Sequence, residues 1–428
     1  MLLEKKNIVE KWNSVGLVSR IAIGLAIGTA LGLLLPKVQV IGLPGELFVS
    51  ALKVIAPLLV LTLVMSALAG AKAKTSISLI VVLYALSTFT ATLIAAVGSV
   101  ILPIDLTLVT AAEQNAPTGV GEVLQNLLNN IVANPVTALT TANYLGILAW
   151  AILLGIALRY STDTTKAVLS NFSDALSTIV RWVINLTPIG VMGLVYTAVS
   201  TNGLTIFTVY GKLLILLVGC MAFIALALNP LIVFSLLRRN PYPLVLRCLK
   251  ESGITAFFTR SSAANIPVNL ELCRRFGLDR ETYAVSIPLG AIANMAGAAV
   301  TITVMSMAAA HTMGIVVDLP TLIVLCMLAT IATTSASGIP GGSLLLIPLV
   351  CSLFNISNDV AMQVVAIGFV ISVVQDSFET ALNSSSDVLF TATAEYRARM
   401  KAGKSFQVTL LPPSLAHPVV ELDGANNW

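Results

Sequence analysis

Long apolar runs without a charged residue constrain this chain more than any other feature. They cover residues 75–104, 123–158, 182–211 and 213–237. About 20 predominantly apolar residues suffice for a helix to cross the hydrocarbon core of a bilayer. In the whole sequence 10% of residues are charged, whereas a soluble domain carries about 25%. The chain is therefore predicted to be an all-α polytopic membrane protein.

The charges outside these runs predict how the chain is oriented. Further spans are expected at residues 21–35 with their flanks, 46–69, 282–317 and 360–396. Basic and acidic residues gather on alternate loops, with Lys37 on an acidic loop as the one exception. The basic loops include Lys5, Lys6, Lys72, Lys74, Arg238, Arg239, Arg397 and Arg399, and the acidic loops include Glu46, Asp105, Asp318 and Asp359. Because basic loops stay on the cytoplasmic side, both termini are predicted to be cytoplasmic.

Two segments break this alternation and are predicted not to cross. Residues 240–276 have basic flanks on both sides, and residues 318–359 have acidic flanks on both sides. Each holds short apolar arms around a polar tip, TRSSAANIP (259–267) and TTSASGIPGGS (333–343). Such a pattern is typical of re-entrant hairpins, and each is followed by a broken or polar helix, as in the inverted repeats of secondary transporters. For the first tip, a plain cytoplasmic turn is the alternative.

A polar stretch, QDSFETALNSSSD (375–387), lies inside the last predicted span. Asp376, Thr380, Asn383 and Asp387 follow one another at spacings of 4, 3 and 4, which places them on one stripe of a helix. A charge at the centre of a bilayer costs roughly 3 kcal/mol. The stripe is therefore predicted to face the protein interior, where it meets a cation or an ammonium group. The alternative is that these residues only hold helices together.

A second stretch, SIPLGAIANMAGAAV (286–300), weakens its helix. Pro288, Gly290 and Gly297 free backbone carbonyls around Asn294, and oxygen ligands of this kind suit a hard cation such as sodium. Glycines that serve only for close helix packing are the alternative.

The hairpin tips offer hydroxyls and N–H groups, which attract anions such as a substrate carboxylate. These are Ser261 and Ser262 at the first tip and Ser337 to Ser343 at the second.

Four ordered motifs together resemble the dicarboxylate/amino acid:cation symporter family, which has the glutamate-transporter fold. They are RSSAANIPVN, NMAG where the family has NMDG, SGIPGG, and DxxETxxNxxxD where the family has DxxRTxxNxxxD. The resemblance covers roughly residues 15–398, and within the family it is closest to the bacterial sodium-coupled serine–threonine branch.

The resemblance implies eight membrane helices, two oppositely oriented re-entrant hairpins and a homotrimer that moves its cargo like an elevator. The implied parts are a cytoplasmic N-terminus (1–14), a membrane domain (15–398) and a flexible cytoplasmic tail (399–428). Within the membrane domain, the scaffold would comprise about 15–70 and 122–200, and the transport part about 75–104 and 205–398.

The resemblance also implies the site residues. Asp376 would bind the substrate ammonium, and Asn383 with Ser262 would hold its carboxylate. The remaining implied substrate-binding residues are Thr380, Glu379, Arg260, Ser261, Ile339 and Gly341. One sodium site would use Gly290, Asn294, Asn383 and Asp387, and a second would use Ile292, Thr333, Thr334 and Ser335.

Two departures from the family motifs bear on function. Glu379 stands where members with acidic substrates carry Arg, which argues against aspartate or glutamate. We expect Arg260 to hold Glu379, which then helps to recognise a substrate hydroxyl. Ala296 replaces the Asp of NMDG, which in the family binds a third sodium with the positions of Tyr84, Ser87 and Thr88. Fewer coupled sodium ions are therefore predicted than in glutamate transporters.

The leading hypothesis is sodium-coupled import of the small neutral hydroxy amino acids L-serine and L-threonine across the bacterial inner membrane. A sodium- or proton-coupled symporter of C4-dicarboxylates or acidic amino acids is the alternative within the family. A membrane-embedded enzyme is disfavoured because His311 has no evident catalytic partner, and a passive channel because two hairpins over a polar site suit occlusion. Nucleic-acid binding has no support, since the basic residues follow one membrane face.

Overall fold

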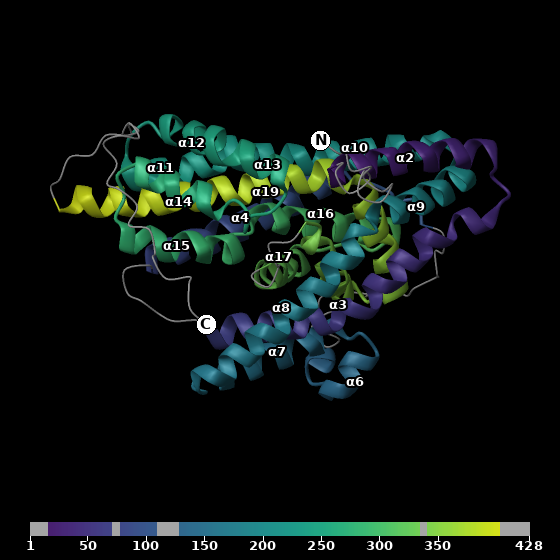
Figure 1. Ribbon diagram of the computed structural model, residues 1–428, viewed down its shortest axis with the longest axis horizontal. Helices are drawn as coiled ribbons and strands as arrows, with labels where there is room; N and C mark the ends of the chain where they lie inside the picture. Colours follow the sequence, from purple (N-terminus) through teal and green to yellow (C-terminus); the bar gives the residue numbers. More distant parts are fainter. Residues whose placement is uncertain (1–15, 71–77, 109–127, 334–339, 403–428) are drawn as a thin grey trace, which may run out of the picture.

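The computed structural model describes residues 16–70, 78–108, 128–333 and 340–402. Within these ranges the chain is helical and holds no strand, which confirms the all-α class. Figure 1 shows the helices as an elongated upper layer with a smaller group beneath it. The predicted N-terminal segment 1–14, most of the predicted tail, and Thr334, Ser335 and Ile339 lie outside the described residues.

One set of helices packs mainly within itself. α2 lies along α9, and α3 contacts α7, α8 and α9, while the short α6 packs on α7. Their bounds are α2 Leu17–Leu34, α3 Leu43–Gly70, α6 Pro135–Thr140, α7 Tyr144–Leu158, α8 Asp163–Asn185 and α9 Thr187–Asn202. In Figure 1, α3, α6, α7 and α8 form the lower group.

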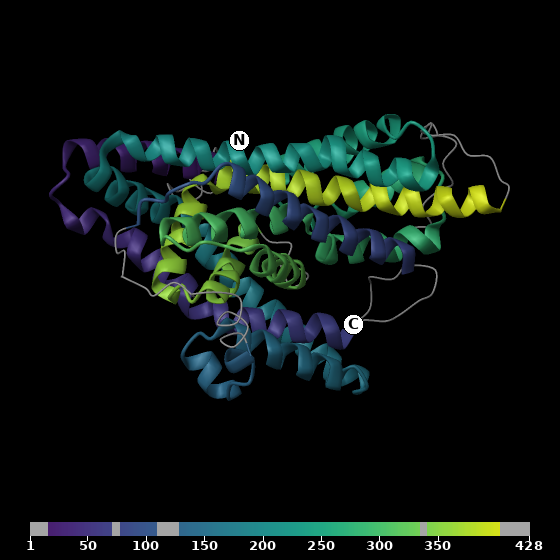
Figure 2. The same ribbon diagram turned by 180° about the vertical axis from the view of Figure 1, so that it is seen from behind.

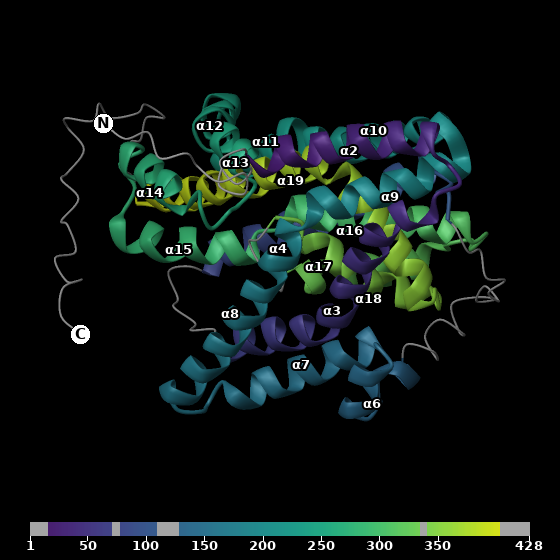
Figure 3. The same cartoon turned by 45° about the vertical axis from the view of Figure 1, so that its right-hand side comes forward.

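The remaining helices surround α19. α4 packs against α16 and α17, and α19 contacts α10, α11, α13, α15, α16 and α18. Their bounds are α4 Ser78–Ile101, α10 Ile206–Phe223, α11 Asn229–Leu237, α13 Ile254–Thr259, α15 Arg280–Ala293, α16 Ala296–Thr312, α17 Leu319–Thr333, α18 Ile347–Cys351 and α19 Asn358–Lys401. Figure 2 shows α19 as one long yellow rod, and Figure 3 places α16, α17 and α18 in the centre of the molecule.

α19 is a single helix of 44 residues. The Ser357 side chain accepts a hydrogen bond from the Val360 amide and so caps its first turn. At 1.5 Å per residue the helix is about 66 Å long, roughly twice the hydrocarbon core of a bilayer. It ends at Lys401, a little way into the segment predicted as a tail.

Both predicted hairpins are helix–turn–helix units. The first consists of α12 (Tyr242–Cys248), a π-helical turn (Leu249–Gly253), α13 (Ile254–Thr259) and α14 (Ile266–Arg275). The second consists of α17 (Leu319–Thr333), a 3₁₀ turn (Gly342–Leu346) and α18 (Ile347–Cys351), with part of its tip outside the described residues. That they enter the membrane from opposite sides stays a prediction.

The helix break predicted around Asn294 is confirmed. α15 ends at Ala293 and α16 begins at Ala296, so Asn294 and Met295 lie between two helices. Asn294 has φ −96° and ψ 83°, which is not helical. Its side chain and the neighbouring backbone groups are thereby directed toward the centre of the structure.

The predicted bounds of two spans are wrong. The run 182–211 includes two helix boundaries, because α8 ends at Asn185 and α9 at Asn202. Thr187–Pro188 begins α9, where proline suits a first helical turn, and Gly203 with φ +65° ends it. In the run 123–158, the longest described helix is α7. The uncharged runs therefore predicted where apolar segments lie, but they did not predict where the helices begin and end.

Five segments of the described chain are long and apolar enough to cross a membrane. One of them, Thr187–Leu237, has 51 residues and includes α9, α10 and α11, so it is too long for a single crossing. The molecule is thus a multi-pass membrane protein by length and composition, and the count of eight helices stays a prediction.

The close packing of α2 on α9 gives a first testable consequence. A Cβ at Gly28 would clash with the backbone of Met192, whereas one at Gly211 on α10 meets nothing within 4 Å. Gly28→Ala should therefore destabilise the fold by about 1–3 kcal/mol, since the two backbones must separate. Gly211→Ala, its control, should be neutral or slightly stabilising. Thermal unfolding in detergent measures both, and an equal Tm for the two variants would contradict this packing.

Candidate functional site

The polar stripe of α19 is buried at the centre of the structure. Asp376, Glu379, Thr380, Asn383 and Asp387 are between 1% and 6% exposed. Around them lie the tips of both hairpins and the break between α15 and α16. The prediction that this stripe faces the protein interior is confirmed.

Asp376 contacts both hairpins. The Arg260 Nε at the first tip donates to Asp376 Oδ2 at 2.8 Å, and the Gly341 amide at the second tip donates to Asp376 Oδ1 at 3.3 Å. Both side chains of the ion pair are buried. The Thr380 hydroxyl donates to the Asp376 carbonyl at 2.8 Å, one turn back along the helix. Asp376 is therefore the point where the two tips and α19 meet.

The predicted pairing of Arg260 with Glu379 is wrong, because Arg260 binds Asp376. Glu379 Oε2 instead accepts from three neutral donors: Thr301 Oγ1 at 2.7 Å, Ser343 Oγ at 2.9 Å and Gln375 Nε2 at 2.5 Å. These donors satisfy Oε2 without a guanidinium. Its other oxygen, Oε1, has no hydrogen-bond partner among the described residues.

Sequence reasoning missed all three donors of Glu379. Gln375 lies one helical turn before Glu379, and residues at i and i+4 share a helix face. The spacing in the sequence could therefore have indicated this partner. Ser343 stood at the edge of the second hairpin motif. Thr301 on α16 carried no signal in the sequence.

Asn294 and Asp387 form the core of the first predicted sodium site. Asn294 Nδ2 donates to Asp387 Oδ1 at 2.9 Å, to Ser386 Oγ at 2.7 Å and to the Asn383 carbonyl at 3.2 Å. Asn294 Oδ1 and Asp387 Oδ2 are buried and have no hydrogen-bond partner among the described residues. Buried polar groups are almost always paired, so two such oxygens on linked side chains require an explanation.

Gly290 completes this corner from the α15 side. A Cβ there would lie 2.6 Å from Asp387 Oδ1 and 2.8 Å from the Tyr84 hydroxyl. Only glycine lets the α15 backbone approach the carboxylate this closely. Unpaired carboxylate and amide oxygens are ligands that a hard cation accepts, so Asn294 and Asp387 fit a sodium ion.

Asn383 is oriented by the broken helix. Its Oδ1 accepts from the Gly297 amide at 2.7 Å, and its Nδ2 lies 3.5 Å from the sulfur of Met295, a weak acceptor. Ser262 is 5% exposed beside Arg260, and the Ser261 hydroxyl accepts from the Ala264 amide at 3.2 Å. The structure thus brings the substrate residues predicted on α19 close to those of the first tip.

The second predicted sodium site is described only in part, whereas the positions of the family's third site are all described. Thr333 is buried and its hydroxyl donates to the Thr330 carbonyl at 2.9 Å, while the Ile292 residue is 48% exposed. Tyr84 donates to the Ser286 carbonyl at 3.2 Å and Ser87 donates to Asn229 Oδ1 at 3.3 Å. The second site stays a prediction because two of its residues lie outside the described ranges.

A network of amides that the sequence did not indicate fastens the first hairpin to α19. Asn265 Nδ2 donates to Ser384 Oγ at 2.8 Å and to the Ser252 carbonyl at 3.2 Å. Asn269 Nδ2 donates to the Ser384 carbonyl at 3.1 Å. Both arms of the hairpin are thereby held to the helix that carries the carboxylates.

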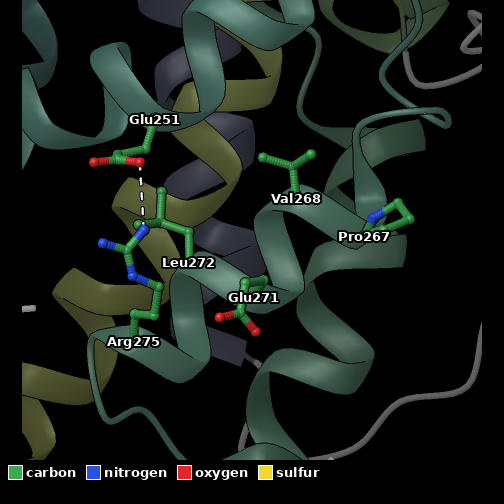
Figure 4. Close-up of a pocket in the computed structure, with 6 residues that line it drawn as sticks. All are labelled: Glu251, Pro267, Val268, Glu271, Leu272 and Arg275. Carbon is green, nitrogen blue, oxygen red and sulfur yellow. Dashed lines mark hydrogen bonds and ion pairs between the residues drawn. The ribbon is translucent and has the colours of Figure 1, made fainter. Parts of the chain in front are cut away.

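A separate cavity of about 350 Å³ lies between the arms of the first hairpin (Figure 4). An ion pair between Arg275 and Glu251, 3.3 Å long, joins the two arms there. The lining residues are Glu251, Pro267, Val268, Glu271, Leu272 and Arg275. None of them belongs to the carboxylate stripe, so this cavity is distinct from the candidate site.

Long apolar helices, two helix–turn–helix units and buried carboxylates beside a broken helix define a multi-pass membrane protein with a polar site inside its helical body. The chain belongs to the sodium:dicarboxylate symporter family, whose model matches residues 17–396.

Curated relatives of high similarity are named serine/threonine transporters. The protein called "Serine/threonine transporter SstT" of Streptococcus agalactiae is 57% identical over 394 residues, which cover 91% of this chain and 98% of the relative. Proteins with the same name from Streptococcus thermophilus and Bifidobacterium adolescentis are each 54% identical, over 91% and 93% of this chain and 98% and 94% of the relatives. The expected family is therefore confirmed.

The corner of Asn294 and Asp387 gives a second testable consequence. Asp387→Asn keeps the shape of the side chain but removes its charge, so stabilisation by sodium should be lost. A ligand that binds the folded state raises stability by RT ln(1 + [L]/Kd). The rise in Tm between potassium chloride and sodium chloride measures it. Asp174→Asn, on an exposed position of α8, is the control and should keep the full rise. A full sodium effect in Asp387→Asn would remove this carboxylate from the site.

Proposed function

We propose that this protein imports L-serine and L-threonine across the bacterial inner membrane, coupled to the entry of sodium. The observation that carries the proposal is Glu379. A carboxylate stands where acidic-substrate members of the family have Arg, and its second oxygen remains available beside Asp376. Relatives at 54–57% identity that are named serine/threonine transporters support the same substrates.

In this proposal the substrate lies between the first hairpin tip and α19. Asp376 binds its ammonium, and the presence of the Arg260 cation on that carboxylate supports a cation-binding role. Asn383 and Ser262 hold the substrate carboxylate. Glu379 Oε1 accepts from the substrate hydroxyl. The proposed lining is completed by Thr380, Ser261, Ile339 and Gly341.

Sodium would be held by Gly290, Asn294, Asn383 and Asp387, and a second ion by Ile292, Thr333, Thr334 and Ser335. The bound cation supplies positive charge that offsets a buried carboxylate. Asn294 fixes one oxygen of Asp387 by its amide and leaves the other to the ion. Asn383 links the two sites because its side chain reaches Gly297 while its carbonyl meets Asn294.

The proposed mechanism is an elevator-like movement of the helices around α19 past the remainder. The packing supports this division, since α2, α3, α7, α8 and α9 contact one another extensively and α19 gathers the others. The scaffold then comprises about residues 15–70 and 122–200, and the transport part about 75–104 and 205–398. A homotrimer, eight membrane helices with two opposed re-entrant hairpins, and cytoplasmic termini belong to the same proposal.

The description of the family favours a second candidate, a sodium- or proton-coupled symporter of dicarboxylates or acidic amino acids. Glu379 weighs against it. A second substrate carboxylate would lie beside two buried carboxylates, and like charges repel strongly where the dielectric constant is low. Competition by succinate or aspartate distinguishes the two functions.

Uptake of radiolabelled L-serine into proteoliposomes tests the proposal. An inward sodium gradient should drive accumulation, and potassium in its place should not. Unlabelled threonine should compete and aspartate should not. Asp376→Asn should reduce uptake to less than about a tenth, because it removes the charge that meets the ammonium. Uptake that ignores sodium, or that aspartate blocks, would instead favour the second candidate.

The role of Glu379 has its own test. Glu379→Gln should raise the half-saturating concentration of serine about tenfold or more, since a hydrogen bond to a charged acceptor contributes roughly 1.5–3 kcal/mol. Inhibition by alanine, which lacks the hydroxyl, should change less. Glu281→Gln, at an exposed position of α15, serves as the control. An unchanged half-saturating concentration for serine would show that Glu379 does not recognise the hydroxyl.

A further inference from the structure

Arg260 is the one buried basic residue in the part of the chain that the structure describes. Arg260 is 5% exposed and lies at the tip of the first hairpin, directly after α13. Its backbone has φ +53°, a conformation that residues other than glycine seldom adopt. This left-handed conformation ends α13 at Arg260, as it ends α11 at Arg238.

The ion pair of Arg260 with Asp376 uses only part of the guanidinium. Nε donates to Asp376 Oδ2 at 2.8 Å. The two terminal nitrogens form no hydrogen bond with any described residue. Arginine and carboxylate groups commonly form two parallel hydrogen bonds. Here the terminal fork, which is the part best suited to a carboxylate, remains available.

The Asp376 side of the pair is also incompletely engaged. Among the described residues its Oδ1 accepts only from the Gly341 amide of the other hairpin, at 3.3 Å. The pair thus joins an anion on α19 to a cation on the first tip through one short hydrogen bond. A small molecule that carries both a cationic and an anionic group is complementary to Asp376 and Arg260.

We infer that the substrate enters by inserting its ammonium and carboxylate groups between Asp376 and Arg260. This inference rests on the proposed function and extends it, because it assigns Arg260 as a further ligand of the substrate carboxylate. The ammonium replaces Arg260 Nε on Asp376, and the released guanidinium binds the carboxylate. One ion pair is broken and two are formed, so no buried charge is left alone.

Insertion explains why the site would select molecules that carry both an ammonium and a carboxylate group. A ligand with only an ammonium group would displace Arg260 and leave it unpaired, and a ligand with only a carboxylate would leave Asp376 unpaired. Removing one partner of a buried ion pair is strongly unfavourable. A dicarboxylate fails for the same reason and also meets Glu379, which lies one turn from Asp376.

The backbone of the first hairpin is fastened to α19. Asn265 and Asn269 bind the first hairpin to Ser384 of α19. The tip is therefore fixed relative to the stripe, and the exchange of partners requires a rotation of the arginine side chain only.

Ligand binding to the purified full-length protein in sodium chloride tests the inference. The rise in Tm with ligand concentration gives a half-saturating value for L-serine, for L-serinamide, which lacks the carboxylate, and for glycerate, which lacks the ammonium. The variants are Arg260→Gln and Asp376→Asn. Arg274→Gln is the matched control, since Arg274 belongs to the same hairpin and pairs with Glu271 away from the stripe.

Each variant should bind serine more weakly than the wild type does. Each should also bind one of the two partial ligands, serinamide or glycerate, more tightly. Arg260→Gln should bind serine about tenfold more weakly and serinamide about tenfold more tightly, because nothing then competes for Asp376. Asp376→Asn should bind serine more weakly and glycerate about tenfold more tightly, because Arg260 is then available. Arg274→Gln should match the wild type for all three ligands. Because a misfolded variant does not bind a ligand more tightly, a gain in affinity excludes misfolding as its cause.

Serine binding within threefold of the wild type in Arg260→Gln would overturn the inference, as would the absence of both gains. If Arg260→Gln does not fold, the glycerate gain in Asp376→Asn decides. A wild-type protein that binds no serine would overturn the proposed function, and the two gains would still decide whether the ion pair accepts a ligand.

Discussion

The burial of three carboxylates on one helix is the constraint on which the rest of this structure depends. Asp376, Glu379 and Asp387 lie on α19, and each is at most 6% exposed. A buried charge is costly unless it is paired and hydrogen-bonded. The fold meets this demand in three different ways. Asp376 has a guanidinium and Glu379 has three neutral donors. Asp387 has one amide, and its other oxygen has no partner in the part of the chain that the structure describes.

The irregular parts of the fold supply those partners. Arg260 and Gly341 lie at the two hairpin tips, Ser343 follows the second tip, and Asn294 lies in the gap between α15 and α16. A regular helix has no unused backbone groups in its interior and directs few side chains along its own axis. Breaks are therefore where a helical membrane protein presents hydrogen-bonding groups at depth. The polar stripe and the breaks in the helices consequently occupy the same region.

Much of this arrangement was predictable from local patterns, and the rest required the tertiary structure. The spacing of Asp376, Asn383 and Asp387 predicted a shared face, because helical periodicity alone fixes it. Proline and glycines predicted the break at Asn294. The partner of Arg260 was predicted wrongly, since Asp376 and Glu379 lie on neighbouring turns and only the position of the tip decides between them. The ends of α8 and α9 were also missed, because both fall within one uncharged run.

The continuity of α19 limits how this chain can change in evolution. Asp376 and Asp387 are carried on one uninterrupted helix, about 16 Å apart along its axis. A substitution alters one side chain, but an inserted or deleted residue between them rotates one carboxylate by about 100° relative to the other. One of the two would then face lipid or an apolar helix. The segment can therefore vary in composition but not in length, and new specificity in this fold must come from exchange of residues within a fixed frame.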